Sequence, residues 1–424
     1  MPKLQAAIHA LSAVLVAGLP MQGQTLTILH SFTRNTGGGW SPLSGVVVGA
    51  KGELYGTTPL GGASNLGVAY KLIPPASPGG AWTENAIYSF GNQKEDNQPS
   101  AGLLLGPGGA LYGVTGFGPN GSGTVFRLDP PTGTNRYWRE TILYYFTGAD
   151  NGLAGPSVGL TLGPDRTLYG AETAGGTAEN GAVFSVTAPP GGGTPWTEAA
   201  LYDFPGGIGG SGTAGSLARS ADGALYGALA YGGVTGAGAM LGLFPPAVQG
   251  GGWSAKLLYS FGEPPDGNLP QGGVIIGPNG ALFGTTEYGG DTPAGCRDGC
   301  GTVFELDPPA SPGGAWTETI LHAFTGAATG DGYQPNSTLV LGPGDVLYGT
   351  TRSGGASGLG TIFEMIPPPS QGDPWTELVL HSFTGGVADG DTPDALTLGP
   401  AGALYGTTLI GGAGNEGTVF ELVP

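Results

Sequence analysis

Short apolar runs, rich in β-branched and aromatic residues and separated by glycine and proline, make up most of the chain. In one stretch these runs are Gly102–Leu105, Ala110–Thr115, Thr124–Leu128 and Trp138–Phe146. A Gly-Pro-x-Gly segment at Gly106–Gly109 separates the first two runs and is typical of a tight turn. Runs of this length and composition, bounded by turn residues, predict four short antiparallel strands.

The same four-run pattern recurs along the whole chain. Its clearest marker is the phrase Leu-Tyr-Gly-Thr-Thr or a close variant, and the aromatic position of the phrase falls at Tyr55, Tyr112, Tyr169, Tyr226, Phe283, Tyr348 and Tyr405. The spacing is 57 residues except for one interval of 65. Four strands per repeat of this length are typical of a propeller blade. The sequence therefore predicts an all-β fold, a seven-bladed β-propeller of four-stranded blades.

The two ends of the chain complement each other. The last repeat stops at Pro424, after its third strand, while Leu26–Phe32 matches the fourth strand of the other repeats. We expect this N-terminal strand to complete the last blade, since pairing there removes an exposed sheet edge. Residues 25–424 are accordingly read as one propeller domain.

The repeated motifs resemble a known family. The series Leu-Tyr-Gly-Thr-Thr, Gly-Thr-Val-Phe-Glu-Leu, Trp-Thr-Glu and Leu-Tyr-x-Phe is similar to the GloVer repeat of bacterial choice-of-anchor tandem repeat proteins, over about residues 25–424. The resemblance implies an exported bacterial protein, often with a C-terminal sorting signal, whereas this sequence ends within its last repeat. The resemblance implies where the protein is found and how it folds, but it implies no enzymatic activity.

Residues 1–24 have the features of a secretory signal peptide. Lys3 precedes the apolar stretch Ala6–Leu19, which is short for a membrane span, so a transmembrane anchor is the less favoured alternative. We expect a protein that is secreted or held at the cell surface, with no membrane span after signal removal.

The charge of the chain limits its partners. The formal net charge is −18 with only 13 Lys and Arg residues, which argues against nucleic acid and anionic membrane surfaces. The glycines and prolines lie in turns between predicted strands, so their abundance does not indicate disorder.

We expect the protein to be a monomer.

The repeat accounts for the histidines outside the signal segment. His30, His322 and His381 occupy the position that other repeats fill with tyrosine. Alternation along the strand predicts that His322 shares a face with Trp316 and Phe324, as a packed or hydrogen-bonded residue between blades. This reading leaves no histidine for a catalytic triad or a histidine-based metal site, and the sequence predicts no catalytic residue.

Two further repeated positions look structural. Glutamates in the Trp-Thr-Glu position are expected to be solvated or paired across strands; they are Glu84, Glu140, Glu198, Glu318 and Glu377. The glycine after the repeated tyrosine, from Gly56 to Gly406, predicts close approach by an aromatic ring of a neighbouring blade.

Aspartates recur before glycine or asparagine, between the fourth strand and the next blade. They are Asp96, Asp150, Asp266, Asp331 and Asp389, with Asp391 beside the last. Turn formation is the favoured interpretation. Oxygen ligation of Ca²⁺ by Asp331, Asp389 and Asp391 is the alternative, and no other cofactor is expected.

Cys296 and Cys300 lie in an insertion of the fifth repeat. An exported protein favours a disulfide between them, and a zinc site would lack two further ligands.

Variable positions on one face of the ring are the candidates for ligand contacts. The loops after the second and fourth strands emerge on the same edge of every blade, and we call this edge the loop face. Candidate binding residues there are Phe117, Tyr231, Tyr288, Glu287, Arg352 and Glu172. Exposed aromatic rings beside charges suit stacking on sugars or docking to a protein, although rings that simply cap blade ends remain an alternative.

Two classes of function follow. The favoured one is an exported binding module that uses the loop face for a glycan or protein ligand. The alternative is a lyase or glycosidase at the ring mouth with Glu172 and Glu287 as its carboxylates. A purely structural role at the cell surface is a third possibility.

Overall fold

The structure, a computed structural model, describes residues 24–424 apart from 35–36, 78, 92–96, 119–120, 148–155, 249, 294, 312 and 371. Residues 1–23 of the expected signal peptide, together with Asp96 and Asp150, therefore lie outside the described residues. Within the described part of the chain, no helix is long and apolar enough to cross a membrane.

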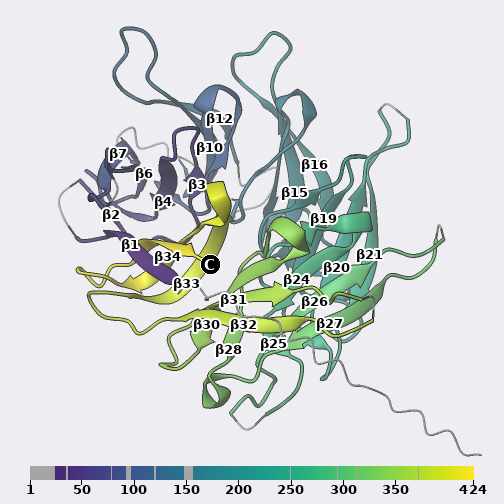
Figure 1. Ribbon diagram of the computed structural model, residues 1–424. Helices are drawn as coiled ribbons and strands as arrows, with labels where there is room; N and C mark the ends of the chain where they lie inside the picture. Colours follow the sequence, from purple (N-terminus) through teal and green to yellow (C-terminus); the bar gives the residue numbers. More distant parts are fainter. Residues whose placement is uncertain are drawn as a thin grey trace, which may run out of the picture.

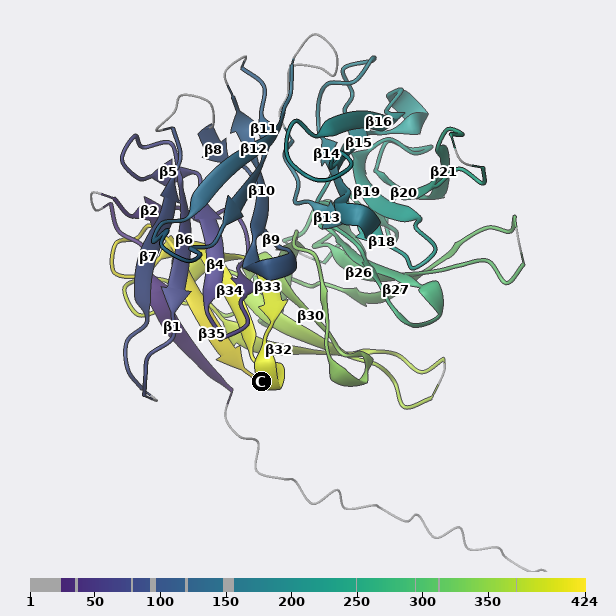
Figure 2. The same ribbon diagram turned by 90° about the horizontal axis from the view of Figure 1, so that it is seen from above.

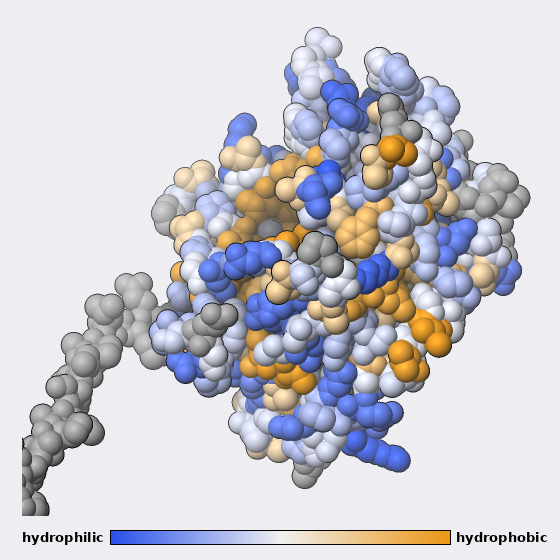
Figure 3. Space-filling view, turned by 90° about the vertical axis from the view of Figure 1, so that its right-hand side faces the viewer, coloured by the Kyte–Doolittle hydropathy of each residue, from blue (hydrophilic) through white to orange (hydrophobic). Residues whose placement is uncertain are grey.

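Seven antiparallel sheets of four or five strands follow one another around a ring (Figures 1 and 2). We call them blades one to seven in chain order. This arrangement confirms the prediction of an all-β, seven-bladed propeller. On the side of the ring shown in Figure 3, apolar side chains lie in separate groups among polar ones.

The first strand of most blades is split into two pieces. The pieces on the loop side are β2 (Gly39–Trp40), β8 (Asn97–Pro99), β17 (Ser211–Thr213), β22 (Gly267–Asn268) and β28 (Gly332–Pro335). The others are β3 (Val47–Val48), β9 (Leu104–Leu105), β13 (Thr161–Leu162), β18 (Ala218–Arg219), β23 (Ile275–Ile276) and β29 (Val340–Leu341). In blade seven, β33 (Gly390–Leu398) spans both, with a register shift between Pro393 and Leu396. The short segment between the two pieces takes no part in the β-ladder with the second strand.

The second and third strands form the centre of each blade. The second strands are β4 (Leu54–Thr58), β10 (Leu111–Phe117), β14 (Leu168–Glu172), β19 (Leu225–Tyr231), β24 (Leu282–Thr286), β30 (Leu347–Gly354) and β34 (Leu404–Gly411). The third strands are β6 (Val68–Ile73), β11 (Thr124–Asp129), β15 (Ala182–Thr187), β20 (Ala239–Phe244), β26 (Thr302–Asp307), β31 (Thr361–Ile366) and β35 (Thr418–Val423). Short strands β5 (Leu60–Gly61) and β25 (Tyr288–Gly289) pair with β2 and β22.

Short 3₁₀ turns complete the connections. Five of them begin at a Gly-Pro pair between the first and second strands, and three of these have the expected Gly-Pro-x-Gly sequence: η1 (Pro107–Gly109), η4 (Pro278–Gly280) and η7 (Pro400–Gly402). The other two of the five are η2 (Pro164–Arg166) and η6 (Pro343–Asp345). Two lie between blades on the loop face, η3 (Gly207–Gly209) and η5 (Ala327–Thr329).

The repeated glycine of the second strand does lie under an aromatic ring, but the ring belongs to the same blade. Gly349 is the direct cross-strand partner of Phe363, and a Cβ at Gly349 would lie 2.4 Å from the Phe363 Cζ. Gly56 and Tyr70 repeat this arrangement. The expectation of a ring from a neighbouring blade was therefore wrong, because the glycine makes room for its own cross-strand neighbour.

The fourth strands form the outer edges. They are β7 (Thr83–Ser89), β12 (Arg139–Tyr145), β16 (Thr197–Asp203), β21 (Ser254–Ser260), β27 (Thr317–Ala323), β32 (Thr376–Ser382) and, for blade seven, β1 (Thr25–Ser31). In Figures 1 and 2 the purple β1 lies beside the yellow strands of blade seven. It pairs antiparallel with β35, from Thr25 opposite Val423 to Ser31 opposite Thr418.

Each fourth strand contains a β-bulge that changes which side chains share a face. In β27, His322 pairs with Val303 and Ile320 pairs with Phe304, so Leu321 is the extra residue. The predicted grouping of His322 with Trp316 was therefore wrong. The Trp316 ring contacts Tyr226 of blade four.

On the other face of β27, side chains contact the following blade. Phe324 packs edge-on against Phe363 of blade six, and His322 lies edge-on beside Phe324. The predicted position of His322 between blades is confirmed. The bulge thus lets one strand present different residues to its two neighbours.

The repeated glutamates are also interblade residues, on the tryptophan side of the bulge. Tyr88 of blade one donates a 2.6 Å hydrogen bond to Glu140 of blade two. Burial, with the nearby charge of Asp266, raises the pKa of Glu318 to about 7. These positions are neither freely solvated nor paired within their own sheet, because the bulge turns them toward the previous blade.

Candidate functional site

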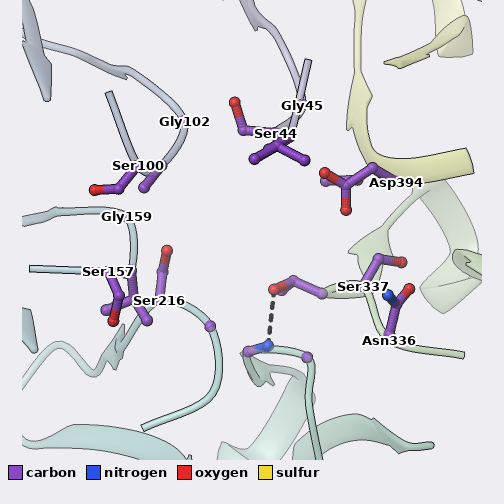
Figure 4. A pocket seen from close by; sticks show the side chains of 18 of the residues that line it. Ser44, Gly45, Ser100, Gly102, Ser157, Gly159, Ser216, Asn336, Ser337 and Asp394 are labelled. Atoms are coloured by element: carbon purple, nitrogen blue, oxygen red, sulfur yellow. Dashed lines mark hydrogen bonds between the residues drawn. The ribbon is translucent and has the colours of Figure 1, made fainter. Parts of the chain in front are cut away.

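The split first strands surround a channel at the centre of the ring. Every blade contributes small or polar residues to a cavity of about 280 Å³ (Figure 4). Its serines are Ser44, Ser100, Ser157, Ser216 and Ser337, and its larger polar residues are Gln271, Asn336 and Asp394. The channel wall therefore combines hydroxyl, amide and backbone groups with small and apolar side chains.

Threonines of the second strands hold these segments in place. The Thr350 hydroxyl donates to the Asp394 carbonyl at 2.6 Å, and the Thr407 hydroxyl donates to the Ser44 carbonyl at 3.0 Å. The first of these bonds joins blade six to blade seven, and the second joins blade seven to blade one. Each satisfies a carbonyl that the break in the first strand leaves outside the ladder.

Replacing Thr350 by valine is expected to lower the free energy of unfolding by roughly 1–3 kcal/mol. Valine keeps the shape of threonine but leaves the buried carbonyl of Asp394 without this donor. Denaturant unfolding would measure the loss. Thr376→Val, at an exposed position in β32, is the control and should change stability little. Equal effects of the two substitutions would contradict the role given to Thr350.

Asp394 is the ionisable side chain among the residues that line the channel. Burial raises its pKa to about 6, and the charge of Arg352 acts in the opposite direction. Figure 4 shows the Asp394 carboxyl group on the channel wall near Ser337. The site can therefore change its charge near neutral pH.

A second pocket opens on the loop face over blades three to five. It has a volume of about 310 Å³ and is lined by Thr173, Ser211, Gly212, Thr213, Ala214, Ala230, Tyr231 and Gln271. Gln271 also lines the central channel, so the two cavities are adjacent.

The pocket combines an exposed ring with an unsatisfied polar group. Tyr231, the last residue of β19, is 57% exposed. Thr213 is buried, and its hydroxyl oxygen has no hydrogen-bond partner in the described structure. A buried hydroxyl without a partner is unfavourable, so this atom is a candidate for bonding to a bound molecule. Of the loop-face candidates, Tyr231 thus lines a pocket.

Two other candidates meet between blades five and six. The Gln334 side-chain amide donates to Glu287 at 3.0 Å and to the Tyr288 hydroxyl at 2.9 Å. Gln334 is fixed by a left-handed backbone (φ 59°) and by a 3.0 Å bond from its N–H to the Cys300 carbonyl. Burial raises the pKa of the Tyr288 hydroxyl. These groups already satisfy one another.

The remaining loop-face candidates stand apart. Phe117 is 52% exposed at the end of β10, where it pairs with Asn97. Arg352 is exposed in β30, and its charge reaches Asp394.

The two proposed catalytic carboxylates have separate surroundings. Glu172 is 1% exposed at the end of β14, and the charged groups nearest to it are Glu198 and Asp203. Glu287 instead bonds Gln334 between blades five and six. No contact within the described residues joins the pair, so the geometry gives no support to a two-carboxylate mechanism.

The aspartates considered for Ca²⁺ accept hydrogen bonds from their own turns. Asp389 accepts bonds from the Thr384 backbone N–H and hydroxyl, both 2.9 Å, and from the Gly390 N–H at 2.8 Å. Asp331 has the equivalent contacts. Asp391 accepts from the Thr392 hydroxyl at 2.8 Å. These contacts support the interpretation of Asp331 and Asp389 as turn formers.

The predicted disulfide is present between Cys296 and Cys300. Both residues are buried, in a cluster with Phe324. The insertion therefore contributes to the core of blade five.

Several site residues were missed by the sequence analysis. Gln271 lies between the two pieces of the first strand in blade five, Thr213 ends β17, and Asp394 lies at the register shift of β33. The sequence pattern that could have indicated these residues is the recurrence of polar residues just before each apolar run. Whether such a segment faces a channel depends on the break in the strand, which the pattern alone does not show.

Seven blades around a polar channel, with an aromatic pocket on the loop face, define this protein as a seven-bladed β-propeller. The family model described as the Gloeobacter/Verrucomicrobia repeat matches residues 15–154, 118–326 and 247–424. The chain belongs to the Gloeobacter/Verrucomicrobia repeat family. No curated protein matches it.

Three solved structures of similar fold are distant in sequence. A putative oxidoreductase (glucose dehydrogenase) from Thermus thermophilus is 15% identical with a TM-score of 0.43, covering 95% of this chain and 100% of the other. The soluble aldose sugar dehydrogenase of Escherichia coli is 14% identical with a TM-score of 0.44, covering 78% and 97%. A gluconolactonase from Xanthomonas campestris is 12% identical with a TM-score of 0.39, covering 83% and 99%. At these values the matches carry no argument about activity.

Proposed function

We propose that this protein is an exported binding module that takes a neutral, hydroxyl-rich ligand, a glycan, in the loop-face pocket beside Tyr231. The observation that carries the proposal is the combination of an exposed ring and a buried, unpartnered Thr213 hydroxyl in one cavity.

The chemistry of the pocket suits a sugar. An aromatic ring offers an apolar face for stacking, while a few placed polar groups fix orientation. The Thr213 hydroxyl and the Gln271 amide can both donate and accept hydrogen bonds. None of the lining residues is ionisable except Tyr231, which favours a neutral ligand.

The adjoining channel gives the ligand room to extend. Gln271 separates the pocket from a cavity lined with serine hydroxyls and backbone groups. A chain of sugar units could therefore continue from the pocket over the channel mouth.

An extracytoplasmic location is part of the proposal. The Cys296–Cys300 disulfide supports it, because disulfides persist mainly in oxidising compartments.

Tyr231→Ala should weaken glycan binding at least tenfold. Thermal unfolding against a panel of oligosaccharides would find the ligand, since binding at 100 times the dissociation constant adds about 2.7 kcal/mol of stability. Titration calorimetry would then compare the variants. Tyr137→Ala removes another tyrosine, 80% exposed and outside the pocket, and should leave affinity unchanged.

Two results would count against this function. One is the absence of a shift with every glycan tested. The other is a glycan shift that Tyr231→Ala leaves intact, which would move the binding site elsewhere.

A further inference from the structure

A group of potential metal ligands lies between blades five and six. Single ligand atoms of His322, Asp331 and Glu377 all lie within 4.8 Å of one another. His322 and Asp331 belong to the end of blade five and the turn that follows, and Glu377 belongs to β32 of blade six. The His322 Nε2 and an Asp331 carboxylate oxygen are 3.2 Å apart.

Each of the three side chains is held in position by the fold. Asp331 accepts bonds from the Thr325 backbone N–H at 2.8 Å, the Thr325 hydroxyl at 2.9 Å and the Gly332 N–H at 2.6 Å. The His322 ring lies edge-on against Phe324 at 4.8 Å. Outer contacts of this kind orient ligands in metal sites.

Glu377 has a buried carboxylate oxygen, Oε1, without a hydrogen-bond partner in the described structure, as Glu84 and Glu318 have at the same repeat position. An unpaired carboxylate oxygen beside a second carboxylate is costly, because no hydrogen-bond donor offsets its lost hydration. A cation at this position would remove the penalty.

The corresponding positions in two neighbouring interfaces lack one of the three groups. His381 and Asp389 repeat the contact at 3.2 Å, but the position of Glu377 is filled by Leu26 of β1. His30 and Glu84 lie 3.6 Å apart, but the position of Asp331 is filled by Gly38. Within the described residues, the group between blades five and six is the one that brings three such ligands together.

We propose that His322 Nε2 and the carboxylates of Asp331 and Glu377 bind a divalent transition-metal ion between blades five and six. One imidazole with two carboxylates suits Zn²⁺ or Mn²⁺. The ion replaces the hydrogen bond between His322 and Asp331, since both groups then turn lone pairs toward it. The side chains of His322 and Asp331 are 23% and 11% exposed, so water can complete the coordination. This site is independent of glycan binding.

The test is a titration of the full chain, free of any histidine tag, with Zn²⁺ and with Mn²⁺ alone. Calorimetry and equilibrium dialysis should show one ion per chain for at least one of the two metals. Glu377→Gln, which keeps the shape of the side chain, should weaken binding at least tenfold. His381→Ala at the related interface should leave affinity and stoichiometry unchanged.

A gain of binding provides the stronger test. Leu26→Glu adds the missing carboxylate opposite His381 and Asp389, so the stoichiometry should rise from one to two. In His381→Ala/Leu26→Glu it should return to one. Thermal unfolding in chelator checks that each variant is folded. No saturable binding of either metal to the wild-type protein, or unchanged affinity in folded Glu377→Gln, would overturn the proposal.

Discussion

Replacing Phe363 by alanine is expected to lower the free energy of unfolding by about 3–5 kcal/mol. Phe363 is fully buried at the centre of β31. Its ring fills the space above Gly349 within blade six and packs against Phe324 of blade five, with ring centres 5.1 Å apart. The substitution therefore opens a cavity inside one blade and at an interface together. Denaturant unfolding monitored by circular dichroism would measure the loss.

Phe363→Leu is the matched control. Blade four carries Leu241 at the corresponding position, directly opposite Gly227, so a leucine fits this place in a blade. We expect a clearly smaller loss than for alanine. If alanine and leucine cost the same, the stabilising role assigned to the aromatic contact between blades would be wrong.

The second large effect expected is a fall in stability as pH rises, caused by Glu172. Burial, with the charges of Glu198 and Asp203, raises its pKa from 4.5 to about 8. The folded state therefore holds this proton more tightly than the unfolded state does. The resulting stability is fully present below pH 4.5 and is lost as pH rises through about 8. Since one pKa unit corresponds to about 1.4 kcal/mol, we expect a loss of roughly 3 kcal/mol after allowing for solvent near the site.

Glu172→Gln should remove much of this dependence. Urea unfolding at intervals from pH 5 to pH 9 would show wild type and variant converging in acid and separating in base, with the glutamine variant the more stable at pH 9. Glu263→Gln, at an exposed glutamate, should leave the pH profile unchanged. Parallel profiles for wild type and Glu172→Gln would mean that the carboxyl group is ionised at neutral pH in the folded protein.

The repeat allowed the fold to be predicted from the sequence, because the seven occurrences of one phrase located the second strand of each blade. What the period could not show was the bulge at Leu321 and its equivalents. Simple alternation along β27 placed Trp316 and His322 on one face, whereas the extra residue turns them toward different blades. The same omission explains why Glu318 and Glu377 were read as surface or within-sheet positions.

The candidate site was only partly predictable for a similar reason. Tyr231 could be predicted because it is an aromatic residue at a loop position that varies from repeat to repeat. Gln271 comes from a segment that leaves the ladder, and Thr213 ends the three-residue strand β17, which is too short for its sequence to show a two-residue alternation. Glu172 was noted as unusual for its repeat, but its burial depends on contacts from other strands.

The bulge in each outer strand makes the two surfaces by which a blade contacts its neighbours different. Most blades present tryptophan and glutamate to the blade before them, whereas blade four carries Ala255 and blade seven carries Leu26 at the glutamate position. Every blade presents histidine or tyrosine with phenylalanine to the blade after it. Successive blades therefore pack in the same orientation around the ring, and each contacts the next through the same two kinds of surface. Each junction uses the same strand positions, although the side chains at them vary, so duplication or loss of one whole repeat unit would preserve the geometry of the remaining junctions. Blade number can then change by copying whole units, while the loop face of each copy is free to diverge.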